Sequence, residues 1–247
     1  MSLMKLTSLL LAILPLLSAQ PDHFGLPACS GELADRSYFL LCHNPSLKVP
    51  TWTGYELTPA RLHGSSTRPT HFRRDAALTG PSAGDSDYTG SGFDRGHMVP
   101  AADLAFSEAA IRVTFLLSNA APQRRSVNAG SWRRVENAVR RIASRADAVY
   151  IFTGAMVAST NPEYIGPGRV AVPTHFYKVI LAVTGNKKTA YAAIVPNSDE
   201  RGPTLDTLAV SVDDVESLTG LDFFSELEDS EESRIESIRQ PLPPPGP

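Results

Sequence analysis

The sequence contains little cysteine, methionine or tryptophan, with two, four and two residues respectively among 247. Its two cysteines are not spaced as a C-x-x-C pair and no H-E-x-x-H motif occurs, so the usual ligand patterns of a zinc site are missing. Beyond the first twenty residues, no apolar run approaches the length of a membrane-spanning helix. What remains is an ordinary globular composition, with 42% hydrophobic and 20% charged residues.

A net basic charge is also missing, since the formal charge is −3, but the charge is distributed unevenly. Between positions 121 and 145, seven arginines accompany one glutamate, whereas between positions 213 and 236 ten acidic residues accompany one arginine. A basic segment is typical of proteins that bind polyanions, although a solvated helix face gives the same pattern.

The first nineteen residues have the layout of a secretory signal peptide: a lysine, an apolar stretch over 9–17, and then Ser18 and Ala19. We expect cleavage after Ala19 and a secreted or periplasmic protein. Leu17 is a poor residue at the third position before that bond, so an uncleaved anchor is the alternative. In an oxidising compartment Cys29 and Cys42 can form a disulfide, and two buried thiols are the alternative.

Short apolar runs predict strands at residues 38–42, 52–57, 114–118, 149–153, 176–184 and 190–195. Residues 58–92 are rich in Gly, Ser, Pro and Arg and predict a long surface loop. From residue 225 the chain is acidic and then proline-rich, which predicts a disordered tail over 225–247 after one domain at 20–224.

Helical periodicity predicts a helix over residues 131–145 and a shorter one over 213–218. The longer helix carries an apolar stripe formed by Trp132, Val135, Val139 and Ile142. Glu136 and Arg140 lie four residues apart, so they project from the same side of this helix.

Polar side chains that suit phosphodiester cleavage follow one another along the middle of the chain. Asp94-Arg95-Gly96-His97 offers a histidine beside an arginine, and Asn119, Gln123, Asn128 and Glu136 follow. Histidine can deprotonate a water near neutral pH, arginines and a divalent metal can offset charge on the phosphate, and Mg²⁺ prefers oxygen ligands.

The runs FDRGHMVPAAD and TFLLSNAAPQRRSVNAGSWRRVE resemble the DNA/RNA non-specific endonucleases of the ββα-metal superfamily. The family pattern of D-R-G-H, then L-S-N-x-x-P-Q, then N-x-x-x-W-x-x-x-E is matched in order and spacing, and the resemblance spans residues 38–224. It implies an α+β fold with a ββα-metal nuclease core, in which a mixed or antiparallel sheet is flanked by helices. His97 would lie near the end of one strand, a second strand would start at Thr114, and the helix would follow Asn128.

The resemblance also implies a role for each matched residue. His97 would be the general base, Asn128 the direct ligand of one Mg²⁺ ion, and Glu136 a holder of that ion through water, with Mn²⁺ as a possible substitute. Arg95 and Arg140 would contact the scissile phosphate. Asn119 would orient the site through hydrogen bonds or serve as a structural amide at the end of a strand.

DNA and RNA are the expected substrates. The arginines expected to contact their backbones without reading bases are Arg73, Arg74, Arg124, Arg125 and Arg133. The alternatives are a nucleic-acid-binding module without turnover and a phosphodiesterase of small nucleotides. The sequence gives no indication of oligomeric state.

Overall fold

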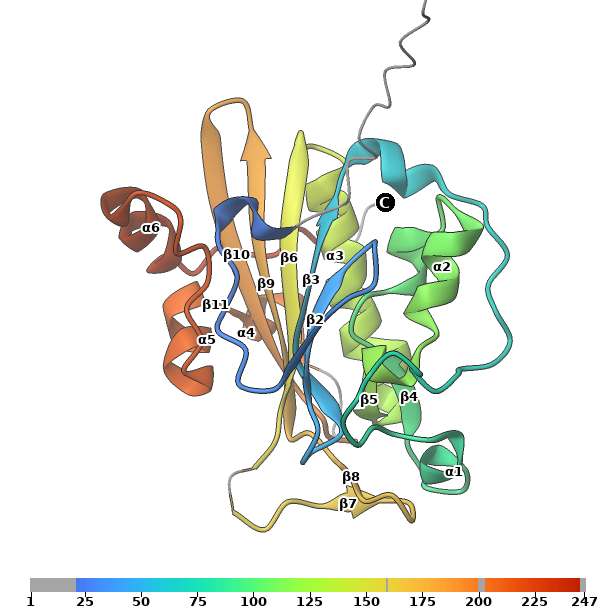
Figure 1. The fold of residues 1–247 in the computed structure, drawn as a ribbon. Helices are drawn as coiled ribbons and strands as arrows, with labels where there is room; N and C mark the ends of the chain where they lie inside the picture. Colours follow the sequence, from blue (N-terminus) through green and yellow to red (C-terminus); the bar gives the residue numbers. More distant parts are fainter. Residues whose placement is uncertain (1–20, 159, 200–202, 245–247) are drawn as a thin grey trace, which may run out of the picture.

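The computed structural model describes residues 21–158, 160–199 and 203–244, which are built around one antiparallel sheet (Figure 1). The expected signal peptide at residues 1–19 lies outside the described residues. In spatial order, the seven strands of the sheet are β1 (Glu32–Asp35), β2 (Leu40–Asn44), β3 (Val49–Leu57), β6 (Ala148–Met156), β9 (His175–Thr184), β10 (Lys187–Pro196) and β11 (Ala209–Val210). Two small antiparallel pairs accompany it, β4 (Asp94–His97) with β5 (Ala120–Gln123) and β7 (Tyr164–Ile165) with β8 (Val170–Ala171).

The helices cover both faces of the sheet. They are α1 (Asp85–Tyr88), α2 (Glu108–Thr114), α3 (Arg133–Ala143), α4 (Leu205–Leu208), α5 (Val212–Thr219) and α6 (Asp229–Glu236). Short 3₁₀ helices occur at η1 (Pro21–Phe24), η2 (Pro59–His63), η3 (Ala101–Leu104) and η4 (Leu117–Asn119), and a π-helical turn, η5 (Val127–Trp132), leads directly into α3. In Figure 1, α2 and α3 lie on one side of the sheet and α5 and α6 on the other.

The central strands are apolar on both faces because each face packs against helices. Successive side chains of a strand point to opposite faces. Ile151 and Phe152 of β6 therefore enter different cores, Ile151 the core that contains Val135 of α3 and Phe152 the core that contains Val212 of α5. Burial on both faces explains why β6 and β9 read in the sequence as nearly continuous hydrophobic runs.

The α+β prediction and most of the predicted elements are confirmed. Five of the predicted strands correspond to β2, β3, β6, β9 and β10, and the two predicted helices to α3 and α5. Helix α5 begins with a capping box, in which the Ser211 hydroxyl accepts from the Asp214 N–H and the Asp214 carboxylate accepts from the Ser211 N–H. It ends at Gly220, whose φ of 69° is the left-handed conformation that favours glycine.

The strand predicted at 114–118 is wrong. Residues up to Thr114 belong to α2, which starts after its N-cap Ser107, and Leu117 begins the 3₁₀ turn η4. A short apolar run does not distinguish a strand from a buried turn at the end of a helix, and here Phe115 is buried against Phe72 and His97. The second strand of the ββα unit is β5, which starts at Ala120.

The prediction of a disordered tail also differs from the structure over the part that is described, 225–244. Residues Asp229–Glu236 form α6, with Ile235 in the core beneath α5, and Leu242 is buried in the core beneath α3. Arg141 donates a hydrogen bond to the carbonyl of Pro243 at 2.6 Å. A few apolar anchors are therefore enough to fix a segment whose average composition is acidic and proline-rich.

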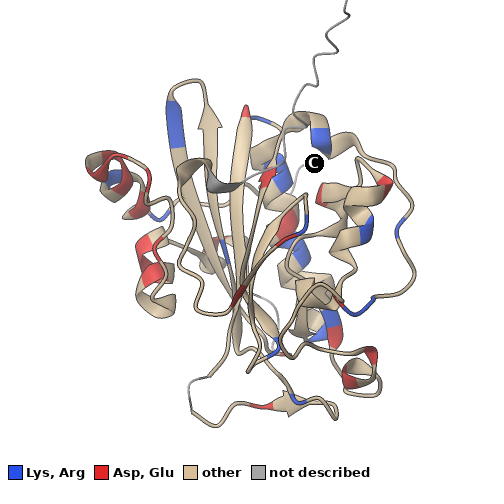
Figure 2. Cartoon of the chain, in the orientation of Figure 1, with Lys and Arg blue, Asp and Glu red and all other residues tan. Residues whose placement is uncertain are grey.

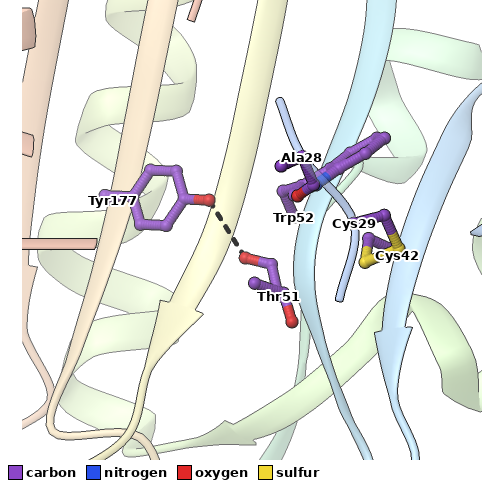
Figure 3. Close-up of a disulfide and its surroundings, with 6 residues drawn as sticks. All are labelled: Ala28, Cys29, Cys42, Thr51, Trp52 and Tyr177. Atoms are coloured by element: carbon purple, nitrogen blue, oxygen red, sulfur yellow. Dashed lines mark hydrogen bonds between the residues drawn. A yellow bond between two sulfur atoms is a disulfide. The ribbon is translucent and has the colours of Figure 1, made fainter. Parts of the chain in front are cut away.

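The disulfide between Cys29 and Cys42 is present, with Cα atoms 5.6 Å apart (Figure 3). It fastens the N-terminal arm to β2, and the Trp52 indole N–H donates to the Ala28 carbonyl at 3.1 Å beside it. The prediction of a disulfide is therefore confirmed over the alternative of two thiols. None of the helices in the described ranges is long and apolar enough to cross a membrane.

Candidate active site

The short pair of strands β4 and β5 positions the D-R-G-H motif. The pair is antiparallel, with Gly96 opposite Ala121 and His97 opposite Ala120, and η5 and α3 follow β5 to complete a ββα unit. Glycine is required at position 96 because a Cβ atom there would lie 2.4 Å from the buried Gln123 side chain. Gln123 is therefore packed against the motif in a structural position.

His97 is buried in an aromatic environment with only 7% of its surface exposed. Its ring centroid lies 4.7 Å from that of Phe72 and 4.8 Å from that of Phe115. Burial, and secondarily the positive charge of Arg68, lower the pKa of His97 to about 3, so the imidazole is neutral. Its Nε2 atom is buried and has no hydrogen-bonding partner among the described residues, and a neutral imidazole keeps one unprotonated nitrogen that can accept a proton.

The backbone around His97 is fixed from two directions. The Trp132 indole N–H donates to the His97 carbonyl at 3.2 Å, which links the strand to the start of α3. Asn119 is completely buried, and its side chain accepts from the Val99 N–H at 2.9 Å and donates to the Val99 and Thr114 carbonyls at 3.0 and 2.9 Å. The Asn119 amide thus holds the chain just beyond His97 and has a structural part in the site.

Asn128 lies in the π-helical turn η5, and its orientation is set by Asp94. The Asn128 Nδ2 atom donates to Asp94 Oδ2 at 2.9 Å, so its Oδ1 atom, the one that can bind a metal, is directed away from that carboxylate. The other Asp94 oxygen lies 3.8 Å from the Arg125 guanidinium. Asp94 is therefore the orienting partner of Asn128.

Glu136 is on α3, one helical turn beyond Trp132, and its carboxylate accepts no hydrogen bond within the described part of the chain. Burial raises the pKa of Glu136 to about 7, and the Lys178 ammonium opposes this rise. Lys178 projects from β9, is completely buried, donates to Thr153 Oγ1 at 2.7 Å and lies 4.9 Å from the Trp132 ring centroid.

Arg140 lies one turn after Glu136 and is held by a buried acid. Its Nη1 atom is 2.8 Å from Asp103 Oδ1, and the Tyr55 hydroxyl donates to Asp103 Oδ2 at 2.6 Å. The proximity of Asp103 and of Glu136 raises the pKa of Arg140 against the effect of burial. The structure thus places Arg140 beside Glu136, as the helical spacing predicts.

Arg95 is placed differently from the other candidates. Its Nη2 atom lies 2.6 Å from Asp85 Oδ1 and 3.1 Å from the Asp85 carbonyl, and its guanidinium lies over the Tyr88 ring at 5.1 Å from the centroid. In this arrangement Arg95 is held by α1, and within the described residues it forms no hydrogen bond or ion pair with Glu136 or Arg140.

The arginines expected to bind a nucleic-acid backbone are mostly accessible. Arg73, Arg74, Arg125 and Arg133 are exposed, whereas Arg124 is half-buried, 3.3 Å from Asp199 and 4.6 Å from the Phe93 ring centroid. Figure 2 marks basic residues in blue on the loop before β4 and on α3.

Arg68, Asp103 and Lys178 act on the site but were not among the predicted site residues. Arg68 lies over the Phe115 ring at 5.2 Å from the centroid, and its charge acts on both His97 and Glu136. With Arg73 it lines an open cavity of about 450 Å³ between the loop and α2. The sequence could have indicated Arg68, because it is one of several arginines in the 58–92 loop. It could not have indicated Lys178, which lies in an apolar strand.

The strand pair, the helix and the set of nitrogen and oxygen donors that they bring together define a nuclease core of the ββα-metal type. Residues 20–230 match the model of the family described as DNA/RNA non-specific endonuclease. The chain belongs to this family.

Similar proteins agree with this assignment. Nuclease C1 of Cunninghamella echinulata var. echinulata is 38% identical over 83% of this chain and 87% of its own length. Human mitochondrial endonuclease G is 35% identical over 81% of this chain and 71% of its own. The crystal structure of the EndoG/EndoGI complex contains a chain that superposes with a TM-score of 0.77 at 29% identity, covering 83% of this chain and 90% of that one.

Proposed function

We propose that this protein is a secreted, Mg²⁺-dependent endonuclease that hydrolyses phosphodiester bonds of DNA and RNA with little sequence specificity. The observation that carries the proposal is the neutral His97, which lies in a ββα unit that also contains Asn128 and Glu136. A binding module would need the arginines but would have no use for a buried, proton-accepting histidine.

His97 would accept the proton of the attacking water. The neutral form predominates above about pH 4 because its pKa is lowered to about 3, so the base is available at every ordinary pH. The negative charge of a bound phosphate would raise that pKa and strengthen the base when substrate is present. Phe72 and Phe115 both pack against the His97 ring and restrict the access of bulk water.

The donor set fits a magnesium ion. Asn128 would be its direct ligand through Oδ1, the oxygen left free by the hydrogen bond to Asp94, and the Glu136 carboxylate would hold the ion through water. A bound Mg²⁺ would supply positive charge to the phosphate and to the leaving oxygen. Mn²⁺, which accepts the same oxygen donors, would substitute.

Arginines would neutralise the phosphate. Arg140 is held by Asp103 beside Glu136, and the charge of Arg68 acts on His97. Both would stabilise the charge that develops during cleavage. Arg95 would have to exchange its contact with Asp85 for a phosphate oxygen. That pair is partly exposed, with 68% of the Asp85 side chain accessible, and exposed ion pairs are weak.

Contacts to the backbone, rather than to the bases, account for low sequence specificity. The exposed arginines 73, 74, 125 and 133, together with Arg124, would bind phosphates along either DNA or RNA.

Secretion is supported by the N-terminal sequence and by the disulfide, which forms in oxidising compartments. Expression of the full chain in a secreting host tests it. Mass spectrometry of the exported protein should give the mass that starts at Gln20, and retention of the intact chain inside the cell would refute secretion.

The activity is tested by incubating the purified chain with supercoiled plasmid and with total RNA, in Mg²⁺ and in chelator. Nicked and linear plasmid and degraded RNA are expected in Mg²⁺ alone, with turnover at least about a thousandfold lower in His97→Ala. The exposed His63 provides a matched control, because His63→Ala should cleave like the wild type. Plasmid that is retarded on the gel but not cut would instead indicate a binding module, and cleavage of small diesters alone would indicate a nucleotide phosphodiesterase.

A further inference from the structure

A group of carboxylates lies between α5 and α6, on the face of the sheet opposite the candidate active site. One carboxylate oxygen from each of Asp213, Glu216 and Glu236 lies within 4.8 Å of the other two. Asp213 and Glu216 are three residues apart on α5 and so share a face of that helix, while Glu236 is the last residue of α6. Figure 2 shows acidic residues along both helices.

The most informative member of this group is Glu236, because it is buried without a partner. Only 4% of its surface is exposed, and its Oε1 atom has no hydrogen-bonding partner among the described residues. An isolated carboxylate is costly to bury, so it must bind a proton or a cation. Burial and the surrounding acids raise the pKa of Glu236 to about 9 and that of Glu216 to about 7.

No basic side chain in the described part of the chain pairs with this group. Asp222 and Glu232 add further negative charge to the surroundings of Glu236, and Glu232 also has a buried oxygen without a partner. The basic side chains of Lys188 and Arg234 pair with Glu231 instead, at 2.7 and 3.9 Å. Within the described ranges, no ion pair involves any of the three clustered carboxylates.

We propose that Asp213, Glu216 and Glu236 form a calcium site that fastens α6 to α5. Carboxylate oxygens are the ligands that Ca²⁺ prefers, and two oxygens on opposite sides of one Ca²⁺ ion lie about 4.8 Å apart, given Ca–O distances of about 2.4 Å. The separations in the group fit within that span. Glu216 Oε1 accepts from the Phe223 N–H at 2.8 Å, which fixes this carboxylate and leaves Oε2 for the ion.

Thermal unfolding of the metal-free protein in increasing CaCl2 at pH 7.5 tests the proposal. We expect Tm to rise by about 3 °C or more at saturation, since a cation that binds only the folded state stabilises it. The test is made in Asn128→Ala, which removes the proposed magnesium ligand far from this group, and the rise should be the same as in the wild type. Calorimetry on that variant should give one bound Ca²⁺ per chain.

Glu236→Gln keeps the shape of the side chain and should abolish both the rise in Tm and the calorimetric signal. Glu226→Gln is the matched control, because Glu226 is an exposed acid of the same segment outside the group, and it should respond like the wild type. If Glu236→Gln does not fold, Asp213→Asn replaces it as the test variant.

Three results would overturn the proposal. The first is an unchanged Tm in CaCl2 for the wild type, and the second is a full response in Glu236→Gln or Asp213→Asn. The third is a response that disappears in Asn128→Ala, which would place the calcium in the active site.

Discussion

Replacing Asn119 by alanine should destabilise the protein strongly while leaving much of its catalytic chemistry intact. The side chain is completely buried, and it accepts one hydrogen bond from Val99 and donates one each to Val99 and Thr114. Alanine would leave one N–H and two carbonyls of the backbone buried without these partners. None of the three bonds is directed at the space beside His97.

The size of the effect follows from these three groups. A buried polar group left without its partner costs about 1–3 kcal/mol, and a carbonyl with a second lone pair is at the low end of that range. The expected loss is therefore about 3–5 kcal/mol. For a domain of this size, about 2–4 °C of Tm correspond to each kcal/mol, so Tm should fall by about 10 °C.

The assay compares thermal unfolding with plasmid cleavage at 15 °C, where Asn119→Ala remains folded. Its kcat should stay within about tenfold of the wild type, since the proposed base is untouched. Asn128→Ala is the matched control and should show the reverse pattern, a nearly unchanged Tm with most activity lost. If Asn119→Ala keeps its Tm and loses about a thousandfold in kcat, the amide acts on the substrate and the structural assignment is refuted.

Three further predictions concern stability and binding. Replacing Cys29 and Cys42 by alanine should lower the free energy of unfolding, measured in urea, by about 3 kcal/mol. A disulfide that closes a loop of this length reduces the conformational entropy of the unfolded chain by about that free energy. An unchanged urea midpoint would contradict this prediction. Glu236 has a folded-state pKa raised to about 9 from 4.5, so its protonation stabilises the fold at low pH and that contribution is lost as the pH rises through 9. The metal-free Tm should therefore fall between pH 6 and pH 9, and the fall should be smaller in Glu236→Gln; equal slopes would count against the raised pKa. Replacing Arg125 and Arg133 by alanine should reduce the slope of log affinity against log salt for DNA by about 1–2, and an unchanged slope would show that neither contacts phosphate.

The main-chain framework was largely predictable because its elements have simple hydrophobic patterns. The apolar runs of the strands and the helical stripe that contains Trp132 and Val139 correspond to side chains that are buried in the structure. The failure at 114–118 has a physical cause. Phe115 is buried against His97 and Leu117 lies in the core beneath α3, and burial in an irregular segment produces the same apolar run as burial in a strand.

The sequence predicted only those residues of the candidate site that belong to a recognisable motif. His97, Asn128 and Glu136 stand at recognisable spacings, and the structure places them in one ββα unit. Lys178 and Asp103 reach the same region through long-range packing, from β9 and η3. From the sequence alone, a lysine in an apolar strand is expected to be exposed. The fold shows instead that Lys178 lies between Thr153 and Trp132.

The acidic C-terminal segment shows why a total charge is a poor guide to order. Like charges oppose folding, but Ile235 and Leu242 bury enough apolar surface to hold the segment against both cores. This packing is unfavourable for Glu236, because it places that carboxylate in a buried position beside Glu216. The apolar residues hold this segment in place, whereas repulsion between its acidic residues destabilises it. Any ligand that neutralises these acids therefore stabilises the segment. That is why the charge pattern that predicted disorder becomes, once the fold is known, the reason to look for a cation.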